Sequence, residues 1–473
     1  MTESRDLRRC GGVLLIAAAL VFAKSLAYPF FIFDDAAHIL ENPHIRSYSF
    51  ESFAWFWKNS LMPVPYTLWG ILAGLTSEPN PAVFRGANLL LHGVNSFLVL
   101  LLLQRWPGFL SRSLLASLLG ALLFLVHPTK IEAVVWISAT KDLLAAFFAL
   151  AALNLFLNVR APGSTQGPTP WKAIVWTYVA IVLAGLSKMP SLAVCLVLLG
   201  WDLLLLRTPK RQVVGFHLPL IALLIAGFVI QDARLGASSG VYVLPWLMKI
   251  SLITSSVSLS LGKLMASTSF HFDYGHTPLL VARALSERFG IFWLMTIAVT
   301  VAPVLFLKRS RRPVSSAVFW SLGLAVILLI PTSGVAAFIF GGFSTVTDRY
   351  LYLPSIGLSL FFAYLWRAAE GMSAGRAKSL KGMLGLALVV FALLGFRQVE
   401  YWKSSTEILE HTAALNPESI LAHEALANIY GRSQEPGAAE RAALHRIYAR
   451  QIIEASLPSE QASDAPTKSS GHF

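Results

Sequence analysis

Charged residues are scarce in this 473-residue chain, where Asp, Glu, Lys and Arg together make up 13%. Soluble domains carry about 25% charged residues, and here apolar residues reach 55% with a mean hydropathy of +0.63. This balance excludes a soluble enzyme, a disordered chain and a coiled coil. There are only two cysteines, Cys10 and Cys195, which excludes a disulfide framework and a cysteine zinc site.

Acidic residues are the scarcer charge in the first 400 residues, with 16 Asp and Glu against 32 Lys and Arg. The last 73 residues reverse this balance, with 9 acidic against 6 basic residues. The net charge of +13 resembles that of nucleic-acid-binding proteins, but the low charge density favours a membrane protein, in which excess Lys and Arg mark cytoplasmic loops. We therefore expect no nucleic-acid partner.

A membrane helix needs about 20 apolar residues. Eleven segments meet or approach this length, and they predict an all-α, polytopic helical bundle. The segments are residues 11–31, 83–104, 113–127, 142–159, 172–187, 189–206, 213–230, 290–307, 317–333, 353–367 and 383–397.

The distribution of Lys and Arg predicts the orientation of the bundle. With the N-terminus in the cytoplasm, one side receives 18 basic and 4 acidic residues, as the positive-inside rule requires. Eleven crossings then place the C-terminal tail outside. The apolar segment 242–268 is predicted to be interfacial or re-entrant, because a crossing there would turn the basic loop 308–312 outward. The first apolar run has no cleavage site, so we interpret it as an uncleaved first span.

Two adjacent carboxylates, Asp34 and Asp35, follow the first span at its outer boundary. Such a pair beside an apolar wall is costly unless it is paired, hydrated or metal-bound, and its environment can tune one member as a general base. The alternative is a helix cap with a solvated partner. His38 lies one helical turn after Asp34, so Asp34, Asp35 and His38 are also a candidate metal site.

A second polar cluster lies around the predicted outer turn between spans three and four. Ionisable residues at membrane depth are candidates for function by default. Lys141 and Asp142 open span four and are expected to pair, and a lysine here is a candidate for holding a phosphate. The alternative is an ion-paired structural hairpin. The cluster consists of His127, Lys130, Glu132, Lys141 and Asp142.

Further candidates interrupt apolar segments elsewhere. Lys188 lies between spans five and six, where it either grips phosphate or extends to lipid headgroups. Arg349 offers a planar fork for phosphate and Tyr350 a ring for a sugar, and the alternative is a structural Asp348–Arg349 pair. His92, on span two, is expected to make interhelical hydrogen bonds.

The polar tail has the alanine, leucine and tyrosine periodicity of one and a half tetratricopeptide units, with Asn416-Pro417 between helices. A free-standing solenoid needs about three repeats, so we expect this tail to pack on the outer loops. Residues 1–400 thus form the predicted membrane domain and residues 401–456 the helical tail. Residues 457–473 are disordered by composition.

Five sequence segments, which occur in the same order along the chain as in a known protein family, give the chain a resemblance to that family. It resembles the transmembrane and tetratricopeptide-repeat-containing (TMTC) O-mannosyltransferases and their bacterial relatives, which are GT-C glycosyltransferases, over about residues 1–430. The segments are FDDAAHILENPHIRS, NLLLHGVNSFLVLLLL, FLVHPTKIEAVVWISATKDLLAAFFALAAL, GLSKMPSLAVCLVLLGWDLLLL and TDRYLYLPSIGL.

The resemblance implies an inverting transfer of mannose or another hexose from a polyprenyl-phosphate donor. The short tail and the compact loops favour a bacterial inner membrane as its location. Asp34 matches the family's first aspartate and would be the base, with Asp35 beside it. The acceptor would be a protein hydroxyl on the outer face, or alternatively a lipid or glycan. No cofactor is implied besides the lipid-linked sugar donor, and a divalent metal is the open alternative. Membrane lipids are expected partners. The rival functions are a flippase of lipid-linked sugars and a tetratricopeptide scaffold.

Overall fold

The computed structural model describes residues 2–32, 34–107, 113–160, 171–235, 245–266, 269–277, 281, 313–335 and 339–456. Over these residues the chain is helical and contains no β-strand, which confirms the predicted all-α fold. The helices that make up the bundle are α1 (Thr2–Phe22), α5 (Pro81–Arg105), α6 (Leu114–Val126), α8 (Thr140–Arg160), α9 (Trp171–Ser187), α10 (Val194–Gly200), α11 (Lys210–Leu235), α12 (Trp246–Ala266), α14 (Pro313–Leu329), α15 (Ile356–Ala369) and α16 (Ala374–Tyr401).

Shorter elements connect these helices on the side where the outer loops are predicted. They are η1 (Ala23–Ala27), η2 (Ala36–Leu40), α2 (Pro43–Arg46), α3 (Phe50–Asn59), α4 (Pro63–Ala73), η3 (Pro128–Lys130), α7 (Ile131–Val135), η4 (Ile137–Ala139), η6 (Met189–Ala193), η8 (Ile330–Thr332), η9 (Ile339–Gly342) and η10 (Asp348–Leu351). On the opposite side, η7 (Trp201–Leu205) continues α10. Helices α17 (Ser405–Leu415), α18 (Ile420–Arg432) and α19 (Ala438–Ser456) form the tail.

Ten of the eleven predicted spans coincide with helices, and the span predicted at 290–307 lies outside the described residues. Within the described ranges, five helices are long and apolar enough to cross a membrane, or six if the bent pair α6–α7 counts as one. The chain is therefore a polytopic membrane protein. The count of eleven crossings stays a prediction, because α9, α14 and α15 are shorter apolar helices.

The core of the bundle lies around α5, which packs against both α6 and α8, with α1 and α15 against α6. Small residues allow the closest of these approaches. A Cβ atom on Gly120 of α6 would lie 2.8 Å from the carbonyl oxygen of Ser359 on α15, so only glycine fits. Close backbone contact through small residues is how membrane helices associate when apolar burial gives no driving force between them.

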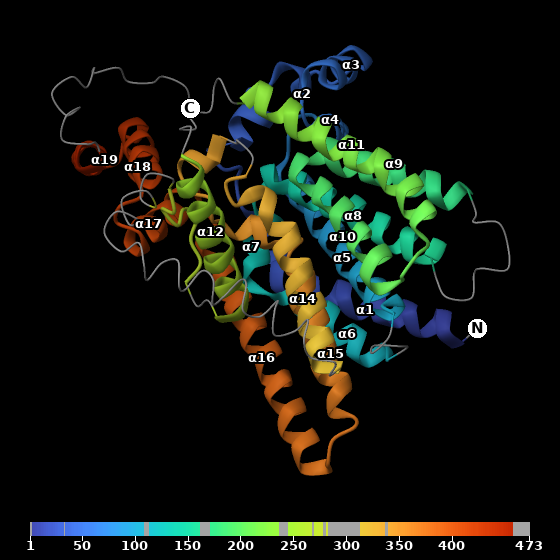
Figure 1. Cartoon of the computed structure of the whole chain (residues 1–473). Coiled ribbons are helices and arrows are strands. Elements are labelled where there is room, and N and C mark those ends of the chain that lie inside the picture. The colour runs from blue at the N-terminus through green and yellow to red at the C-terminus, as the bar shows by residue number, and fades with distance from the viewer. Residues whose placement is uncertain are drawn as a thin grey trace.

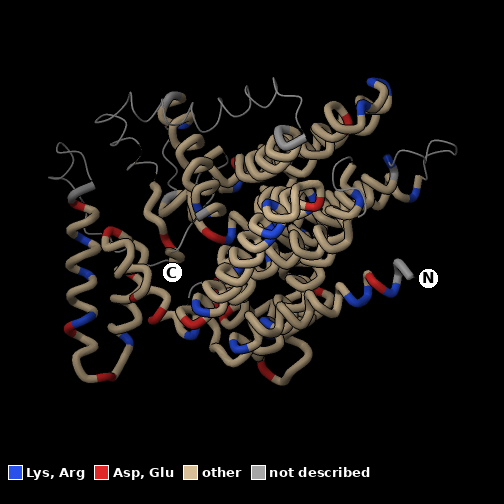
Figure 2. The backbone as a smooth tube through the Cα atoms, turned by 90° about the horizontal axis from the view of Figure 1, so that it is seen from below, with Lys and Arg blue, Asp and Glu red and all other residues tan. Residues whose placement is uncertain are grey.

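The ends of the bundle are chemically different. Figure 1 shows the N-terminus and the tail on opposite sides of the bundle, with α16 running from its turn with α15 toward the tail. In Figure 2, Lys and Arg prevail over Asp and Glu near the N-terminus, whereas both signs alternate along the tail helices. This arrangement agrees with an N-terminus and a tail on opposite sides of a membrane. Which side is cytoplasmic stays a prediction.

A break after α6 brings polar residues into the bundle. The axis bends by 57° between Leu114–Val126 and Pro128–Val135, because Pro128 cannot continue the hydrogen-bond ladder of α6. The short helix α7 then carries Glu132 among buried neighbours, where Glu132 is 2% exposed. An irregular backbone at this depth is tolerated because protein surrounds it.

The tail is docked onto the segment 269–277. The hydroxyl of Ser419 donates to Asp273 Oδ2 at 2.6 Å, and Thr412 Oγ1 accepts from the Phe272 N–H at 3.1 Å. Asn416, between α17 and α18 as the sequence indicates, donates to the Asp273 carbonyl at 3.2 Å. The tail thus packs against the loop 269–277, while the position of this loop on the outer face and the tetratricopeptide identity of the tail stay predictions. Residues 457–473 lie outside the described residues.

Ser419→Ala is expected to loosen this docking by about 1–3 kcal/mol, because the hydroxyl both caps α18 and binds the buried Asp273. Limited proteolysis of the tail and thermal unfolding measure the effect. Ser404→Ala is the matched control, since Ser404 caps α17 without a bond to the loop. Equal effects of the two substitutions would contradict a docking role for Ser419.

Candidate active site

The two aspartates after the first span have different surroundings. Asp35 is fully buried, and its carboxylate accepts from the Phe31 N–H at 3.0 Å, from the Ser138 N–H at 2.8 Å and from the Ser138 hydroxyl. Burial raises the pKa of Asp35 to about 6, and the hydrogen bonds from Ser138 and Phe31 oppose that rise. Asp35 therefore ties the first loop to η4, with no oxygen left open to a substrate.

Asp34 sits in a crowded position yet keeps 43% of its side chain accessible. Its Oδ2 lies 3.2 Å from Lys141 Nζ and 3.9 Å from His38 Nε2. Burial opposes ionisation of Asp34, but Lys141 and then His38 outweigh it, so the pKa of Asp34 falls below its usual value. Asp34 is thus ionised and open to an incoming group.

His38 is held by aromatic neighbours from α4. Its Nδ1 lies 2.7 Å from the Tyr66 hydroxyl, and its ring stacks on Trp69 with a centroid distance of 5.5 Å. Burial, with Lys141 adding to it, lowers the pKa of His38 to about 4, so the ring is neutral at pH 7. A neutral ring that accepts the Tyr66 hydroxyl at Nδ1 carries its proton on Nε2, toward Asp34.

Lys141 and Asp142 are consecutive but face different partners. Lys141 pairs with Asp34, whereas Asp142 Oδ1 pairs with Lys188 Nζ at 2.6 Å. The prediction that Lys141 pairs with Asp142 is therefore wrong, because neighbouring residues at a helix start point in different directions. The start of α8 thereby connects the first outer loop to the hairpin between α9 and η6.

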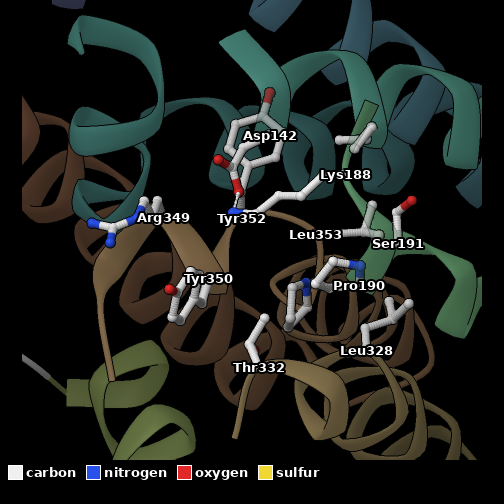
Figure 3. Close-up of a pocket in the computed structure, with 13 residues that line it drawn as sticks. Asp142, Lys188, Pro190, Ser191, Leu328, Thr332, Arg349, Tyr350, Tyr352 and Leu353 are labelled. Atoms are coloured by element: carbon white, nitrogen blue, oxygen red, sulfur yellow. Dashed lines mark hydrogen bonds and ion pairs between the residues drawn. The ribbon is translucent and has the colours of Figure 1, made fainter. Parts of the chain in front are cut away.

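Asp142 and Lys188 line a cavity of about 400 Å³, counting its open mouth. Figure 3 shows Lys188 extending across this cavity to Asp142. The Lys188 ammonium lies 4.9 Å from the centroid of the Tyr350 ring, and burial lowers the pKa of Lys188 against the opposing effect of Asp142. The remaining lining residues are Ala145, Ala146, Pro190, Ser191, Leu328, Thr332, Arg349, Tyr352, Leu353 and Pro354.

Arg349 lines the same cavity, but its guanidinium points away from it in Figure 3. The guanidinium pairs with Glu132, whose other oxygen accepts from the Arg349 N–H at 2.8 Å. It also lies 4.1 Å from the centroid of the Phe340 ring. Arg349 therefore does not pair with Asp348, which was the alternative from the sequence, because Glu132 on α7 is its partner.

Asp348 pairs instead with residues from α12 and the segment 269–277. The Tyr274 hydroxyl lies 3.0 Å from each oxygen of Asp348, and Lys263 Nζ lies 3.5 Å from one of them. The Lys263 ammonium also lies over the Tyr274 ring, 3.5 Å from its centroid. The loop that anchors the tail therefore also fixes the start of η10, next to Arg349.

Three predicted residues lie outside the cavity and have structural partners. Lys130 Nζ donates to the Leu351 and Tyr352 carbonyls, at 3.3 and 3.0 Å, and to the Ser355 hydroxyl. His127 bonds to Thr129 and to the Leu264 carbonyl, and His92 bonds to the Tyr352 hydroxyl and to the Leu125 carbonyl. Lys130 and His92 thus fix the end of η10 and the residue after it, whereas His127 connects η3 to α12.

A metal site gains no geometric support. Among the described residues, no group of three or more His, Cys, Asp or Glu side chains is arranged to hold a metal ion. Asp35 is occupied by Ser138 and Phe31, which separates it from His38. His271, Asp273 and His276, which lie close together in the segment 269–277, bond to different backbone and hydroxyl partners.

Sequence reasoning missed Arg85, which is 1% exposed on α5. Its guanidinium donates to the carbonyls of Tyr28, Pro29 and Val135. It thus fixes the chain just before the aspartates against the end of α7. A lone arginine near the outer end of an apolar span is costly, and that cost is the signal that could have drawn attention to it.

Comparison of the sequence with known proteins finds relatives that share one named activity. No family model matches the chain. It is 29% identical over 199 residues to mouse protein O-mannosyl-transferase TMTC4, covering 37% of this chain and 26% of the relative. A Caenorhabditis elegans protein O-mannosyl-transferase is 24% identical, covering 89% of this chain and 60% of the relative. Mouse protein O-mannosyl-transferase TMTC3 is 23% identical, with 72% and 39% covered.

The chain spans less than two thirds of the length of each of these relatives. The TMTC4 match covers a part of the chain, whereas the nematode match extends over most of it. All three relatives carry the name of the same transferase activity. The chain is therefore a relative of the TMTC-type protein O-mannosyltransferases.

Proposed function

We propose that the chain is a membrane glycosyltransferase that moves mannose or another hexose from a polyprenyl-phosphate donor to a protein hydroxyl. The acceptor would lie on the outer face of a bacterial inner membrane. The observation that carries this proposal is the position of Asp34. Its carboxylate is accessible and pairs with Lys141, and the residue after Lys141 is Asp142, which lines the cavity. The names of the relatives support the reaction class.

In the proposed reaction the acceptor oxygen attacks the anomeric carbon of the donor sugar. A new carbon–oxygen bond forms while the bond from that carbon to the phosphate oxygen breaks, and the sugar configuration inverts. The acceptor proton goes to Asp34, and polyprenyl phosphate leaves. General-base assistance of this kind contributes about 10²–10⁴-fold in rate.

The leaving phosphate needs a cation, and Lys188 is the one that crosses the cavity. Phosphate would exchange with Asp142 as the partner of Lys188, since charge-assisted bonds to phosphate are strong. Asp142 Oδ2 is buried and accepts no hydrogen bond within the described part of the chain. That oxygen would then accept a sugar hydroxyl, while Arg349 supports the site through its positive charge.

Lys141→Met is expected to move the acid limb of the pH dependence of kcat/KM to higher pH. Loss of the ammonium 3.2 Å from Asp34 leaves burial as the main influence, so the pKa of Asp34 rises. Asp34 is then protonated, and inactive as a base, at a pH where the wild type still works. The acid limb reports the pKa of the base in the free enzyme.

The control for this pH profile is Lys58→Met, which removes an exposed lysine of α3 in the same outer loop. We expect its acid limb to match that of the wild type. An acid limb that stays in place or moves to lower pH in Lys141→Met would remove Lys141 from the assigned role beside the base.

Mass spectrometry of outer-face proteins tests the proposed acceptor class. Cells that express the chain are expected to carry hexose on Ser or Thr of one or more exported proteins, and cells without it are not. Cells that express Asp34→Asn provide the matched background, because this chain is present but lacks the base. Protein glycosylation could instead be identical in cells with the chain, without it and with Asp34→Asn. If a surface lipid or glycan then carried the added hexose in the cells with the wild-type chain alone, the result would favour a lipid or glycan acceptor.

A further inference from the structure

A second polar cavity lies at the other end of α8. It is lined by Arg160, Ile174, Tyr178, Gln212, Gly215 and Phe216, and measures about 530 Å³ counting its open mouth. Arg160 is the last residue of α8, whereas Lys141 is the second. At about 1.5 Å per helical residue the two lie roughly 28 Å apart, so this cavity is separate from the candidate active site.

Arg160 is held rigidly at the base of this cavity. Its Nη1 donates to Gln212 Oε1 at 2.9 Å and its Nη2 to Asp202 Oδ2 at 3.2 Å. Asp202 is fully buried and also binds Thr208 and His217. These contacts fix the orientation of the guanidinium but do not use all of its hydrogen-bond donors. The Nε–H of Arg160 is buried and has no hydrogen-bond partner among the residues described.

The surroundings of the cavity are strongly basic. Lys172 at the start of α9 and Lys210 and Arg211 at the start of α11 are exposed. Within α9 and α11 the single acidic residue is Asp232, near the far end of α11. The Arg160 guanidinium keeps one free donor beside its pair with Asp202, which is not among the residues that line the cavity. Together with the exposed cations around it, this donor attracts an anion and suits phosphate geometry.

The surface beside the cavity is apolar. Trp171 and Trp176 on α9 are 67% and 60% exposed, and Val214 and Leu218 on α11 are 60% and 63% exposed. Tryptophan at the end of an apolar helix is typical of the membrane–water interface. The anion that fits here therefore carries an apolar body next to its charged head, which describes a phospholipid rather than a soluble phosphate.

We propose that this cavity binds the phosphate headgroup of an anionic phospholipid in the leaflet on the N-terminal side. Arg160 is the principal ligand, and Tyr178, which donates to the Phe216 carbonyl at 2.5 Å, lines the cavity with it. The site is independent of the proposed transfer reaction and takes no part in its chemistry. Its function is to anchor the starts of α9 and α11 to the bilayer.

Native mass spectrometry of the purified full chain tests this site. The protein is equilibrated with phosphatidylglycerol, with phosphatidylcholine or with inorganic phosphate. The wild type is expected to retain one phosphatidylglycerol in preference to phosphatidylcholine. Gln212→Glu, which keeps a partner for Arg160 but places a carboxylate in the cavity, should lower that retention about fivefold or more.

Ser379→Asp is the matched control, because it adds one negative charge at an exposed position of α16 outside the cavity. We expect it to retain phosphatidylglycerol like the wild type. Equal retention by Gln212→Glu and the wild type, or equal retention of phosphatidylcholine, would overturn the site. Displacement of the lipid by millimolar inorganic phosphate would overturn the assignment to a lipid. Failure of sugar transfer would leave this result unaffected.

Discussion

Replacing Asp34 with Asn is expected to lower the rate of sugar transfer by about 100- to 10,000-fold, which is the usual contribution of a general base. Asn has nearly the same shape but cannot accept the acceptor proton at neutral pH. Because Asp34 keeps 43% of its side chain accessible, its loss should disturb the fold little. Transfer from a polyprenyl-phosphate hexose in isolated membranes measures the rate.

Glu41→Gln is the control for Asp34→Asn, since Glu41 is an exposed carboxylate seven residues further along the same loop. It should transfer sugar at the wild-type rate. Thermal unfolding of each variant separates a lost base from a lost fold. A folded Asp34→Asn protein with full activity would exclude Asp34 as the base.

The second large effect is expected at the Lys188–Asp142 pair. Lys188→Met leaves a buried carboxylate without its partner, which should cost about 3–5 kcal/mol in free energy of unfolding. The same substitution removes the cation that crosses the cavity, so transfer should also be lost. Thermal unfolding and the transfer assay are measured on the same preparation.

A double variant, Asp142→Leu with Lys188→Met, separates these two effects. Removal of both charges should restore most of the stability, because apolar residues of similar volume replace a buried pair at little cost. Transfer should stay at least about 100-fold below the wild type, since the ammonium that crosses the cavity is gone and the Arg349 guanidinium stays paired with Glu132. Recovery of activity together with stability would reduce the pair to a structural role.

The sequence predicts much of the bundle, because apolar run length is sufficient to locate membrane helices. It also indicates which polar residues matter, since charges within such runs are costly. The sequence predicts Asp34, the Lys141–Asp142 pair, Lys188 and Arg349 as candidates in four separate segments, and the structure brings them to one region. The sequence does not predict which residue forms an ion pair with each of these charged side chains.

The two pairs formed by Lys141 and Arg349 illustrate this limit. Sequence proximity suggests Asp142 and Asp348 as their partners, whereas the structure gives Asp34 and Glu132. These partners come from α7 and from the first loop, far away in sequence. Their positions depend on the break at Pro128 and on the anchoring of the loop by Arg85. Neither contact leaves a periodic pattern in the sequence.

The distinction between Asp34 and Asp35 also required the structure. Both residues follow the same apolar run, and the composition around them is the same. Only the position of Ser138, about a hundred residues later, shows that Asp35 is enclosed while Asp34 stays open. The buried hydrogen bonds of Asp35 make it a support for the loop, which leaves Asp34 as the accessible carboxylate.

The most direct test of the proposed function is product stoichiometry in proteoliposomes that contain only the purified chain. Labelled hexose on polyprenyl phosphate and a Ser/Thr-rich acceptor peptide are supplied, and glycopeptide and free polyprenyl phosphate are quantified together. We predict equal amounts of the two products, and neither with Asp34→Asn. Movement of intact lipid-linked sugar across the bilayer without glycopeptide, at the same rate in Asp34→Asn, would contradict the assignment and favour a flippase.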